Sequence, residues 1–329
     1  MKFSVINILK KEWFLACMVV AIVLAALIPQ VGQSDGILHL NKVTDIGIAL
    51  VFFLHGIGLS PQALKNGVSN WKLHLFVQCA TFVIYPMLWV IFGQGMLSIM
   101  PHALAFGFCF LFVLPSTISS SVAMTAIGKG NIPGAIFNAS LSSILGIVIT
   151  PLLIQLFMGF EGVQLDIMSS VMSISKMLLL PMIIGQVLRP LLLSTFEKHK
   201  NIVNKLDKYV ILLIVFNAFS DSVSEGVWHS FSFEYVAMSV LICSVVLVSI
   251  VQLMVWTTKR LGFSHADEVA AVFCGSKKTL AAGIPMAKVI FGSDPRLGMI
   301  LLPIMIYHPL QIFYCAVLAN RYQKKAFAI

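Results

Sequence analysis

Two adjacent lysines stand near the middle of an apolar stretch that is long enough to cross a membrane. The stretch covers residues 266–291, and its centre reads Phe-Cys-Gly-Ser-Lys-Lys-Thr-Leu-Ala-Ala-Gly-Ile-Pro from residue 273 to residue 285. Lys277 and Lys278 lie too far from either end for both ammonium groups to reach water. A charge at such depth costs at least about 2.5–3.5 kcal/mol. We therefore expect both lysines to bind a ligand or to pair with an essential group.

The same stretch and an earlier one, residues 103–127, each contain residues that interrupt helices. The earlier stretch reads Leu-Pro-Ser-Thr-Ile-Ser-Ser-Ser from residue 114 to residue 121. Proline removes a helical hydrogen bond, and unwound backbone is tolerated inside a membrane only where it lines a cavity or is buried in protein. The alternative is an ordinary proline kink with nearby serines. The predicted break residues are Pro115, Gly275, Gly283 and Pro285.

Acidic partners for the lysines are few. Asn217, Asp221 and Glu225 recur every four residues, so they share one face of the stretch 209–230. A carboxylate inside a membrane serves as an ion ligand, a proton carrier or a counter-charge. The alternative is that this stretch ends at Ser220 and leaves Asp221 outside.

Further polar side chains belong to stretches that would neighbour the breaks. Residues 131–158 are expected to face residues 103–127 across a short turn, and Gln78 lies in the stretch 72–93. The polar side chains singled out in residues 131–158 are Asn138, Ser140, Ser142 and Ser143. His55, His308 and Gln311 are interpreted as helix–helix hydrogen-bonding residues. The six cysteines are interpreted as buried apolar residues, with a metal or redox site as the alternative.

The composition identifies the class of protein that must hold these residues. The chain has 329 residues, of which 59% are hydrophobic and 11% are charged, and its mean hydropathy is +0.95. Soluble domains carry about 25% charged residues. These values exclude a soluble enzyme, a disordered chain and a disulfide-rich module, and they predict an all-α polytopic protein of the lipid bilayer. In a membrane protein the basic residues behind the net charge of +9 indicate which side of the membrane each loop lies on. No nucleic-acid partner is expected.

Ten apolar stretches are long enough to cross a bilayer, which needs roughly 17–25 residues. They are residues 12–28, 43–60, 72–93, 103–127, 131–158, 168–193, 209–230, 234–258, 266–291 and 297–319. With this count most Lys and Arg residues fall on one side, including Lys2, Lys10 and Lys11, whereas Lys42 and Arg296 fall on the other. The positive-inside rule then places both termini in the cytoplasm. The expected location is the plasma membrane, which is the inner membrane in a bacterium.

Five stretches precede the acidic loop at Glu161 and Asp166, and five follow it. An odd number in each half makes the second half begin on the opposite side of the membrane. We therefore predict two inverted repeats, residues 1–160 and residues 161–329, which is a common plan of transporters. The fourth stretch of each half is the interrupted one.

Four sequence segments of the chain resemble those of a known family, the bile acid:sodium symporters. The closest likeness is to a divergent branch of bacterial sodium/bile-acid-cotransporter-like proteins that also includes the seventh vertebrate member. The residues that carry the resemblance are the segment 273–287, Ile-Tyr-His-Pro-Leu-Gln at 306–311, Phe-Leu-His-Gly at 53–56 and Trp-Lys-Leu-His-Leu-Phe-Val-Gln at 71–78.

The resemblance implies a panel domain of spans 1, 2, 6 and 7 and a core domain of spans 3–5 and 8–10. In the core, the broken spans 4 and 9 would cross, with two sodium ions behind the crossing and substrate between core and panel. The first sodium site maps here onto serines of spans 4 and 5. These are Ser119, Ser120 and Ser121 on span 4, and Ser140, Ser142 or Ser143 on span 5.

The second sodium site is where this chain departs from the family. Relatives carry Glu-x-Gly-x-Gln-Asn on span 9, and alignment on Gly275 replaces the Glu by Phe273, the Gln by Lys277 and the Asn by Lys278. Gln78 lies near the family's sodium ligand on span 3. We therefore predict that the second sodium is absent and that Lys277 replaces its charge, with Asp221 or the substrate as counter-charge.

The predicted function is a secondary active transporter that moves a small organic anion with sodium or protons by alternating access. No organic cofactor is expected. The alternative is a non-transporting membrane regulator or scaffold that keeps the fold. An intramembrane enzyme is disfavoured, because the sequence has no HExxH motif, no GxSxG motif and no paired carboxylates for hydrolysis.

Overall fold

The chain folds into helices, as its composition predicts. The computed structural model describes residues 13–34, 36, 38–159, 172, 173, 175–228, 232–292 and 294–326. Within these residues it contains α-helices and two short π-helical segments but no strand. Helices suit a bilayer because they pair their own backbone groups without water. Lys2, Lys10, Lys11, Glu161 and Asp166, on which part of the predicted topology rests, lie outside the described residues.

Six helical segments of the described chain are long and apolar enough to cross a membrane. They are Leu40–Gly58, Trp71–Ile99, Ile132–Phe157, Ser175–Lys198, Phe233–Arg260 and Leu297–Ala326. These segments match six of the ten predicted spans, so the chain is a multi-pass helical membrane protein. The full count of ten and the inverted repeats stay predictions.

The other four predicted spans have different helical structures. The first corresponds to α2 (Trp13–Leu27), a helix of 15 residues. The fourth and ninth are each divided into two shorter helices. The seventh corresponds to α13 (Lys200–Ser224), which begins before the predicted residue 209 because the preceding polar residues are also helical. The helix ends before residue 230 because Gly226 adopts a positive φ of 68°, a conformation that closes helices.

The chain divides into two compact units. Unit 1 comprises Met1–Gly58, Lys176–Phe231 and Ala287–Met299, and unit 2 comprises Leu59–Ser175, Ser232–Met286 and Ile300–Ile329. Each half of the sequence therefore contributes to both units.

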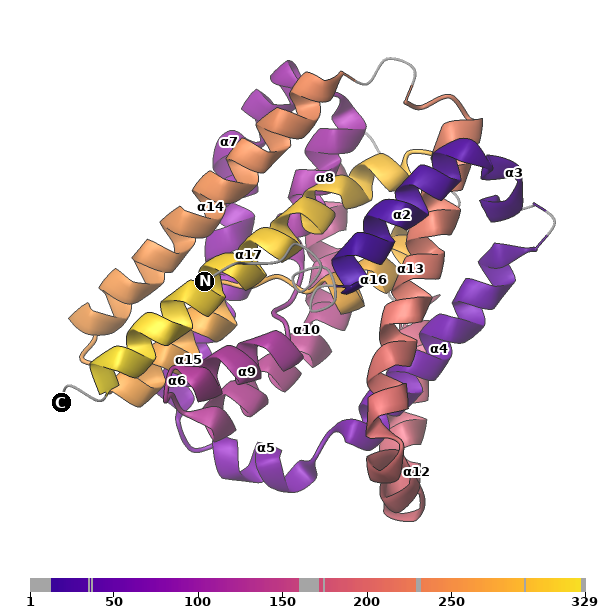
Figure 1. Cartoon of the computed structure of the whole chain (residues 1–329). Helices are drawn as coiled ribbons and strands as arrows, with labels where there is room; N and C mark the ends of the chain where they lie inside the picture. The colour runs from indigo at the N-terminus through magenta and orange to yellow at the C-terminus, as the bar shows by residue number, and fades with distance from the viewer. Residues whose placement is uncertain are drawn as a thin grey trace, which may run out of the picture. The chain divides into compact units, whose positions relative to one another are not determined.

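Unit 1 is held together by close helix packing. It contains α2, α3 (Pro29–Gly32), α4 (Leu40–Gly58), α12 (Leu180–Lys198) and α13. Figure 1 shows α4 and α12 side by side, and a side chain at Gly56 would overlap the carbonyl oxygen of Met182. Gly185 approaches the carbonyl of Phe53 in the same way. Small residues allow this approach, which is typical of helices packed within membranes.

Unit 2 is built around helices that are buried on every side. The buried pair is α8 (His102–Val113) and α15 (His265–Gly275). Every side chain from Ala103 to Val113 is buried, as expected of a helix that is apolar all round. The other helices of the unit are α5 (Pro61–Gly67), α6 (Trp71–Cys79), η1 (Ala80–Ile84), α7 (Tyr85–Ile99), α9 (Ser119–Ile127), α10 (Ile132–Gly159), α14 (Phe233–Arg260) and most of α16 (Leu280–Phe291) and α17 (Leu297–Ala326).

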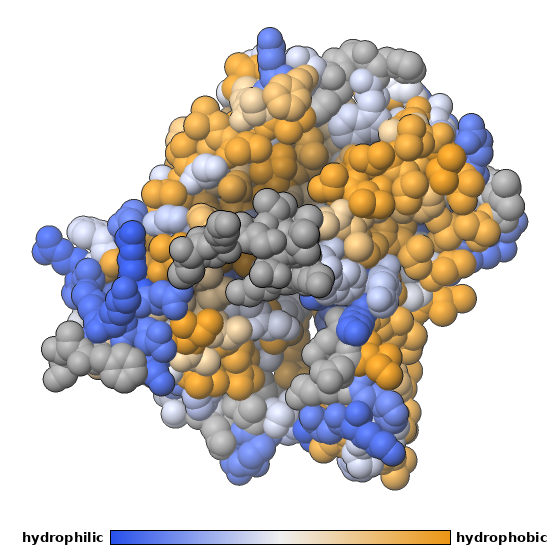
Figure 2. Space-filling model, in the orientation of Figure 1, coloured by the Kyte–Doolittle hydropathy of each residue, from blue (hydrophilic) through white to orange (hydrophobic). Residues whose placement is uncertain are grey.

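Many apolar side chains are exposed on the surface of the described helices. Figure 2 shows hydrophobic residues over much of the visible surface and hydrophilic residues gathered near the C-terminus of the chain. Exposed apolar side chains of α14 include Leu241 and Val245. Apolar surface of this extent is expected where a protein contacts lipid.

Candidate functional site

The two interrupted helices of unit 2 meet at their breaks. Residues 114–118 separate α8 from α9, and residues 276–279 separate α15 from α16. The breaks are joined by hydrogen bonds: the backbone N–H of Thr279 donates to the Pro115 carbonyl at 3.0 Å, and the Ser116 hydroxyl donates to the Cys274 carbonyl at 2.5 Å. The predicted interruptions at Pro115 and Gly275 are therefore present and in contact.

The ammonium group of Lys278 lies inside a cage of backbone oxygens. Its Nζ donates to the carbonyls of Thr81 at 2.9 Å, Phe112 at 2.9 Å and Leu114 at 2.7 Å. It also lies 4.1 Å from the ring centroid of Tyr85, within range of a cation–π interaction. The side chain is fully buried. An ammonium has three N–H donors, so the three carbonyls satisfy it without any carboxylate.

The carbonyl of Thr81 is available because the preceding helix changes its hydrogen-bonding pattern there. Residues Ala80–Ile84 form the π-helical segment η1, and the backbone N–H of Tyr85 donates to Ala80 rather than to Thr81. The next residue is Pro86, which has no N–H to donate. The Thr81 carbonyl therefore lacks a helical partner and accepts from Lys278. A π-helical turn within an α-helix often marks a functional site.

Other buried groups complete the backbone pairing at the second break. Gln311 of α17 accepts from the backbone N–H of Lys278 at 2.9 Å and donates to its carbonyl at 2.8 Å. The hydroxyls of Tyr85 and Tyr307 donate to the Ser276 carbonyl at 2.7 Å and 3.1 Å. Buried backbone groups need such partners, so the break is a defined conformation rather than a frayed helix.

Lys277 has a different environment from Lys278. Its Nζ donates to the carbonyl of Ser120 at 2.9 Å and lies 5.5 Å from the ring centroid of Phe273. The side chain is fully buried. Within the described residues Lys277 has no second hydrogen-bond acceptor and no carboxylate partner, so two of its three N–H donors remain for another group.

The serines after the first break form one hydroxyl cluster. Thr117 Oγ1 lies 2.8 Å from Ser120 Oγ and 2.7 Å from Ser121 Oγ, and Ser121 Oγ donates to the Phe273 carbonyl at 3.0 Å. Ser121 is buried, whereas Ser119 is exposed. This cluster connects the start of α9 to the end of α15.

The predicted polar residues of α10 approach the first break at one position. Ser142 Oγ accepts from the backbone N–H of Ser116 at 2.9 Å. Ser143 instead donates to its own helix at the Ala139 carbonyl, and Ser140 is buried. The predicted neighbourhood of α10 and the first break is therefore present, with Ser142 as the residue that makes the contact.

Gln78 and Asn138 form a second polar pair. Gln78 Nε2 donates to the carbonyl and to Oδ1 of Asn138 at 3.2 and 3.3 Å. The side-chain oxygen of Gln78 is buried and has no hydrogen-bond partner. A buried acceptor without a donor fits a cation that prefers oxygen ligands. The described residues contain no group of three His, Cys, Asp or Glu side chains that could hold a metal ion.

Two predicted break residues have another role. Gly283 and Pro285 lie inside α16 (Leu280–Phe291), so the helix is not interrupted there. A side chain at Gly283 would contact Leu114 at 2.8 Å, so this glycine provides space for the first break. Pro285 lies inside α16 and removes a donor only from the carbonyl of Ala281. The prediction of breaks at these two residues is wrong.

Asp221 belongs to unit 1, where its partners are polar groups of the N-terminal region. Its carboxylate accepts from the backbone N–H and the hydroxyl of Ser34 at 2.8 and 2.7 Å, and from Asn217 at 3.3 Å. The shared face of Asn217 and Asp221 is confirmed, and α13 continues past Ser220. The predicted pairing of Asp221 with Lys277 stays a prediction.

Several residues of the site were not predicted from the sequence. They are Thr81, Tyr85, Thr150 and Tyr307; Thr150 donates to the Val113 carbonyl at 2.8 Å. One signal was available, because Pro86 in the middle of an apolar span leaves a carbonyl without a donor. The tyrosines carried no such signal, since buried tyrosines are common.

Two interrupted helices that meet around buried charges, within a multi-pass helical protein, define a membrane transporter. Comparison with known proteins gives the family. Residues 12–324 match the model of the SBF-like CPA transporter family. The chain belongs to this family.

Its relatives include bacterial and vertebrate proteins. YfeH of Escherichia coli strain K12 is 38% identical over 312 residues, which cover 95% of this chain and 93% of the relative. The uncharacterized protein PA2026 of Pseudomonas aeruginosa is 40% identical, with the same coverage. The sodium/bile acid cotransporter 7-B of Xenopus laevis is 35% identical over 94% of this chain and 91% of the relative. The resemblance to this branch is confirmed, and the chain is a transporter rather than an enzyme.

Proposed function

We propose that this protein is a secondary active transporter that carries a small organic anion across the membrane together with sodium or protons. The single observation that carries the proposal is the meeting of two helix breaks around two buried lysines that have no carboxylate partner among the described residues. A relative of the same family is named a sodium/bile acid cotransporter, which supports cation coupling.

Lys277 is the proposed partner of the transported anion. Its ammonium has one hydrogen bond, to Ser120, and a charged hydrogen bond to an anion contributes about 1.5–3 kcal/mol. Lys277 has no exposed surface, so an anion reaches it only after the site opens. Alternating access supplies that opening.

Lys278 is the proposed replacement for the second sodium ion. The sequence assigned that role to Lys277, but the carbonyl cage surrounds Lys278, and carbonyl oxygens are the ligands that a bound sodium would have. The ammonium then supplies a fixed positive charge. The unpaired oxygen of Gln78 supports a separate sodium site with Asn138 and the serines of the first site, Ser119, Ser120, Ser121, Ser140 and Ser143.

The proposed orientation places both termini in the cytoplasm of the plasma membrane, or of the bacterial inner membrane. The exposed basic residues at the adjoining ends of α14 and α17 support this orientation. They are Lys259, Arg260, Arg321, Lys324 and Lys325. We further propose that unit 1 is the panel domain and unit 2 the core domain, since their residue ranges group spans 1, 2, 6 and 7 apart from spans 3–5 and 8–10.

Uptake into proteoliposomes tests the transport function. Organic carboxylates, sulfates and phosphate monoesters are first screened for thermal stabilisation, since a ligand at 100 times its Kd stabilises by about 2.7 kcal/mol. We expect a stabilising anion to accumulate faster under an inward sodium or proton gradient than without one. Accumulation that is equal with and without both gradients contradicts coupling. A protein that neither binds nor transports any anion would favour the regulator or scaffold.

The Gln78→Leu variant tests the sodium site. Loss of the unpaired oxygen is expected to raise the half-saturating sodium concentration at least about tenfold, because a ligand to a charged group contributes about 1.5–3 kcal/mol. Gln155→Leu is the matched control, since Gln155 also has a buried side-chain oxygen without a partner but is not paired with Asn138. Equal effects of the two substitutions, measured by uptake at varied sodium, would remove Gln78 from the site.

A further inference from the structure

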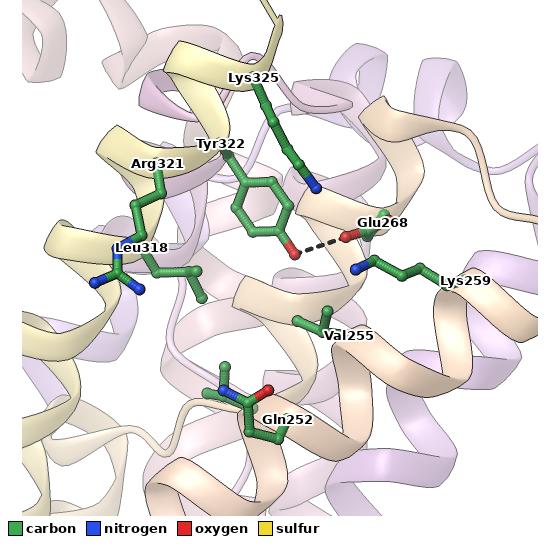
Figure 3. A pocket seen from close by; sticks show the side chains of 9 residues that line it. Gln252, Val255, Lys259, Glu268, Leu318, Arg321, Tyr322 and Lys325 are labelled. Atoms are coloured by element: carbon green, nitrogen blue, oxygen red, sulfur yellow. Dashed lines mark hydrogen bonds between the residues drawn. The ribbon is translucent and has the colours of Figure 1, made fainter.

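A groove of about 260 Å³ opens between three helices of unit 2, away from the breaks. Its walls come from the ends of α14 and α17 and from the start of α15, as Figure 3 shows. The floor is apolar and is formed by Val251, Val255 and Leu318. The rim is basic. The groove therefore combines an apolar surface with a charged opening.

Three cations surround the groove. Lys259 extends from α14, and Arg321 and Lys325 extend from α17. All three side chains are exposed, and among the described residues none of them forms an ion pair within 4.0 Å. Cations without counter-charges at one opening attract anionic groups.

One acidic residue lies in the same groove, and its charge is recessed. Glu268 is 8% exposed, and its Oε1 accepts from the Tyr322 hydroxyl at 2.8 Å. Figure 3 shows Lys259 and Lys325 reaching toward this pair from two helices. Three positive charges against one negative charge leave a net positive groove, so a ligand with one or two negative charges would complement it.

The groove continues into an apolar strip along α14. Leu241, Val245 and Val248 are 64%, 55% and 41% exposed, and their spacing of four and three residues continues to Gln252 and then into the groove. Such spacing places side chains on one helix face. The strip therefore leads from the basic rim along a helix that is apolar and long enough to cross the membrane.

Neighbouring residues mark this end of α14 as a membrane boundary. Trp256 is 58% exposed, and the guanidinium of Arg260 lies 5.6 Å from its ring centroid. Tryptophan is enriched at the level of lipid headgroups. A basic groove at that level with an apolar strip beside it matches a phospholipid better than a free anion, because both parts of a lipid find complementary surface.

We propose that this groove binds one anionic phospholipid, with its phosphate at Lys259, Arg321 and Lys325 and an acyl chain along the α14 strip. No residue of either helix break lines the groove. It does not depend on which anion or cation the protein transports.

The proposal is tested with full-length protein in nanodiscs of phosphatidylcholine containing a few per cent phosphatidylglycerol, with lipid binding followed by native mass spectrometry. The Lys259→Gln/Lys325→Gln double variant is compared with Arg260→Gln/Lys324→Gln, which removes the same charge from exposed residues that do not line the groove. Each basic residue near a membrane surface changes affinity about fivefold, so two of them change it by more than about tenfold. We expect the groove variant to weaken phosphatidylglycerol retention at least about tenfold and the control to weaken it clearly less.

Three outcomes would overturn the proposal. Equal losses of phosphatidylglycerol retention in the two double variants would indicate that the lipid is held by the general positive charge of the surface rather than by the groove. Equal retention of phosphatidylcholine by the wild type would exclude recognition of anionic lipid. Stabilisation by inorganic phosphate that matches the lipid would indicate a site for a free anion. If the groove double variant does not fold, Leu318→Trp fills the floor without a change of charge and is expected to produce the same loss.

Discussion

The Lys278→Met variant is expected to unfold at a clearly lower temperature than the wild type. The substitution keeps the length of the side chain but leaves the carbonyls of Thr81, Phe112 and Leu114 without a donor. An unsatisfied buried polar group costs about 1–3 kcal/mol, so three of them cost about 3 kcal/mol or more. In a chain of this size that corresponds to a fall in Tm of about 6 °C or more, measured by thermal melting in detergent.

The neighbouring lysine provides the matched control. Lys277→Met removes a single hydrogen bond, to the Ser120 carbonyl, so its Tm is expected to fall by about a third as much or less. Equal falls in the two variants would mean that the carbonyl cage does not stabilise the fold. A Lys278→Met protein as stable as the wild type would have the same meaning.

The Lys277→Gln variant is expected to remain folded and to lose affinity for the transported anion. Loss of a charged hydrogen bond of about 1.5–3 kcal/mol lowers affinity by roughly 10- to 100-fold. The Ser120 contact can still form, because the glutamine amide also donates. Binding is measured by the thermal shift with the anion found in the ligand screen, and transport by uptake into proteoliposomes.

Lys324→Gln is the control for this charge change, since Lys324 is exposed at the end of α17. It is expected to leave anion affinity unchanged. If Lys277→Gln binds the anion as tightly as the wild type does, Lys277 is not the anion partner. Lost binding together with a Tm as low as that of Lys278→Met would instead indicate a structural role.

The positions of both helix breaks could be predicted because local chemistry causes them. Pro115 cannot donate a helical hydrogen bond. The hydroxyls of Ser116 and Ser121 that follow it donate to carbonyls at the end of α15. The second break follows Gly275. Pro285 misled the prediction because a proline inside a membrane helix removes one hydrogen bond without ending the helix. Pro151, Pro190, Pro303 and Pro309 also lie inside continuous helices.

The different roles of Lys277 and Lys278 could not be predicted. In a regular helix the period of 3.6 residues fixes the direction of each side chain, so the directions of two adjacent residues can be predicted. Residues 276–279 are not helical, so this rule does not apply to Lys277 and Lys278. Their directions depend on distant partners such as Thr81 and Gln311. For Asp221, the spacing of polar residues predicted the helix face. The spacing could not predict the hydrogen-bond partner, because Ser34 is 187 residues away in the sequence.

The carbonyl cage around Lys278 has a consequence for the transport cycle. A sodium ion that binds at a helix break must shed its water when it enters and regain it when it leaves, once in every turnover. A lysine that occupies such a place loses its water once, when the chain folds, and cannot diffuse away. In the proposed transport cycle, Lys278 would therefore keep a positive charge at the meeting point of the two broken helices, whatever the sodium concentration on either side of the membrane.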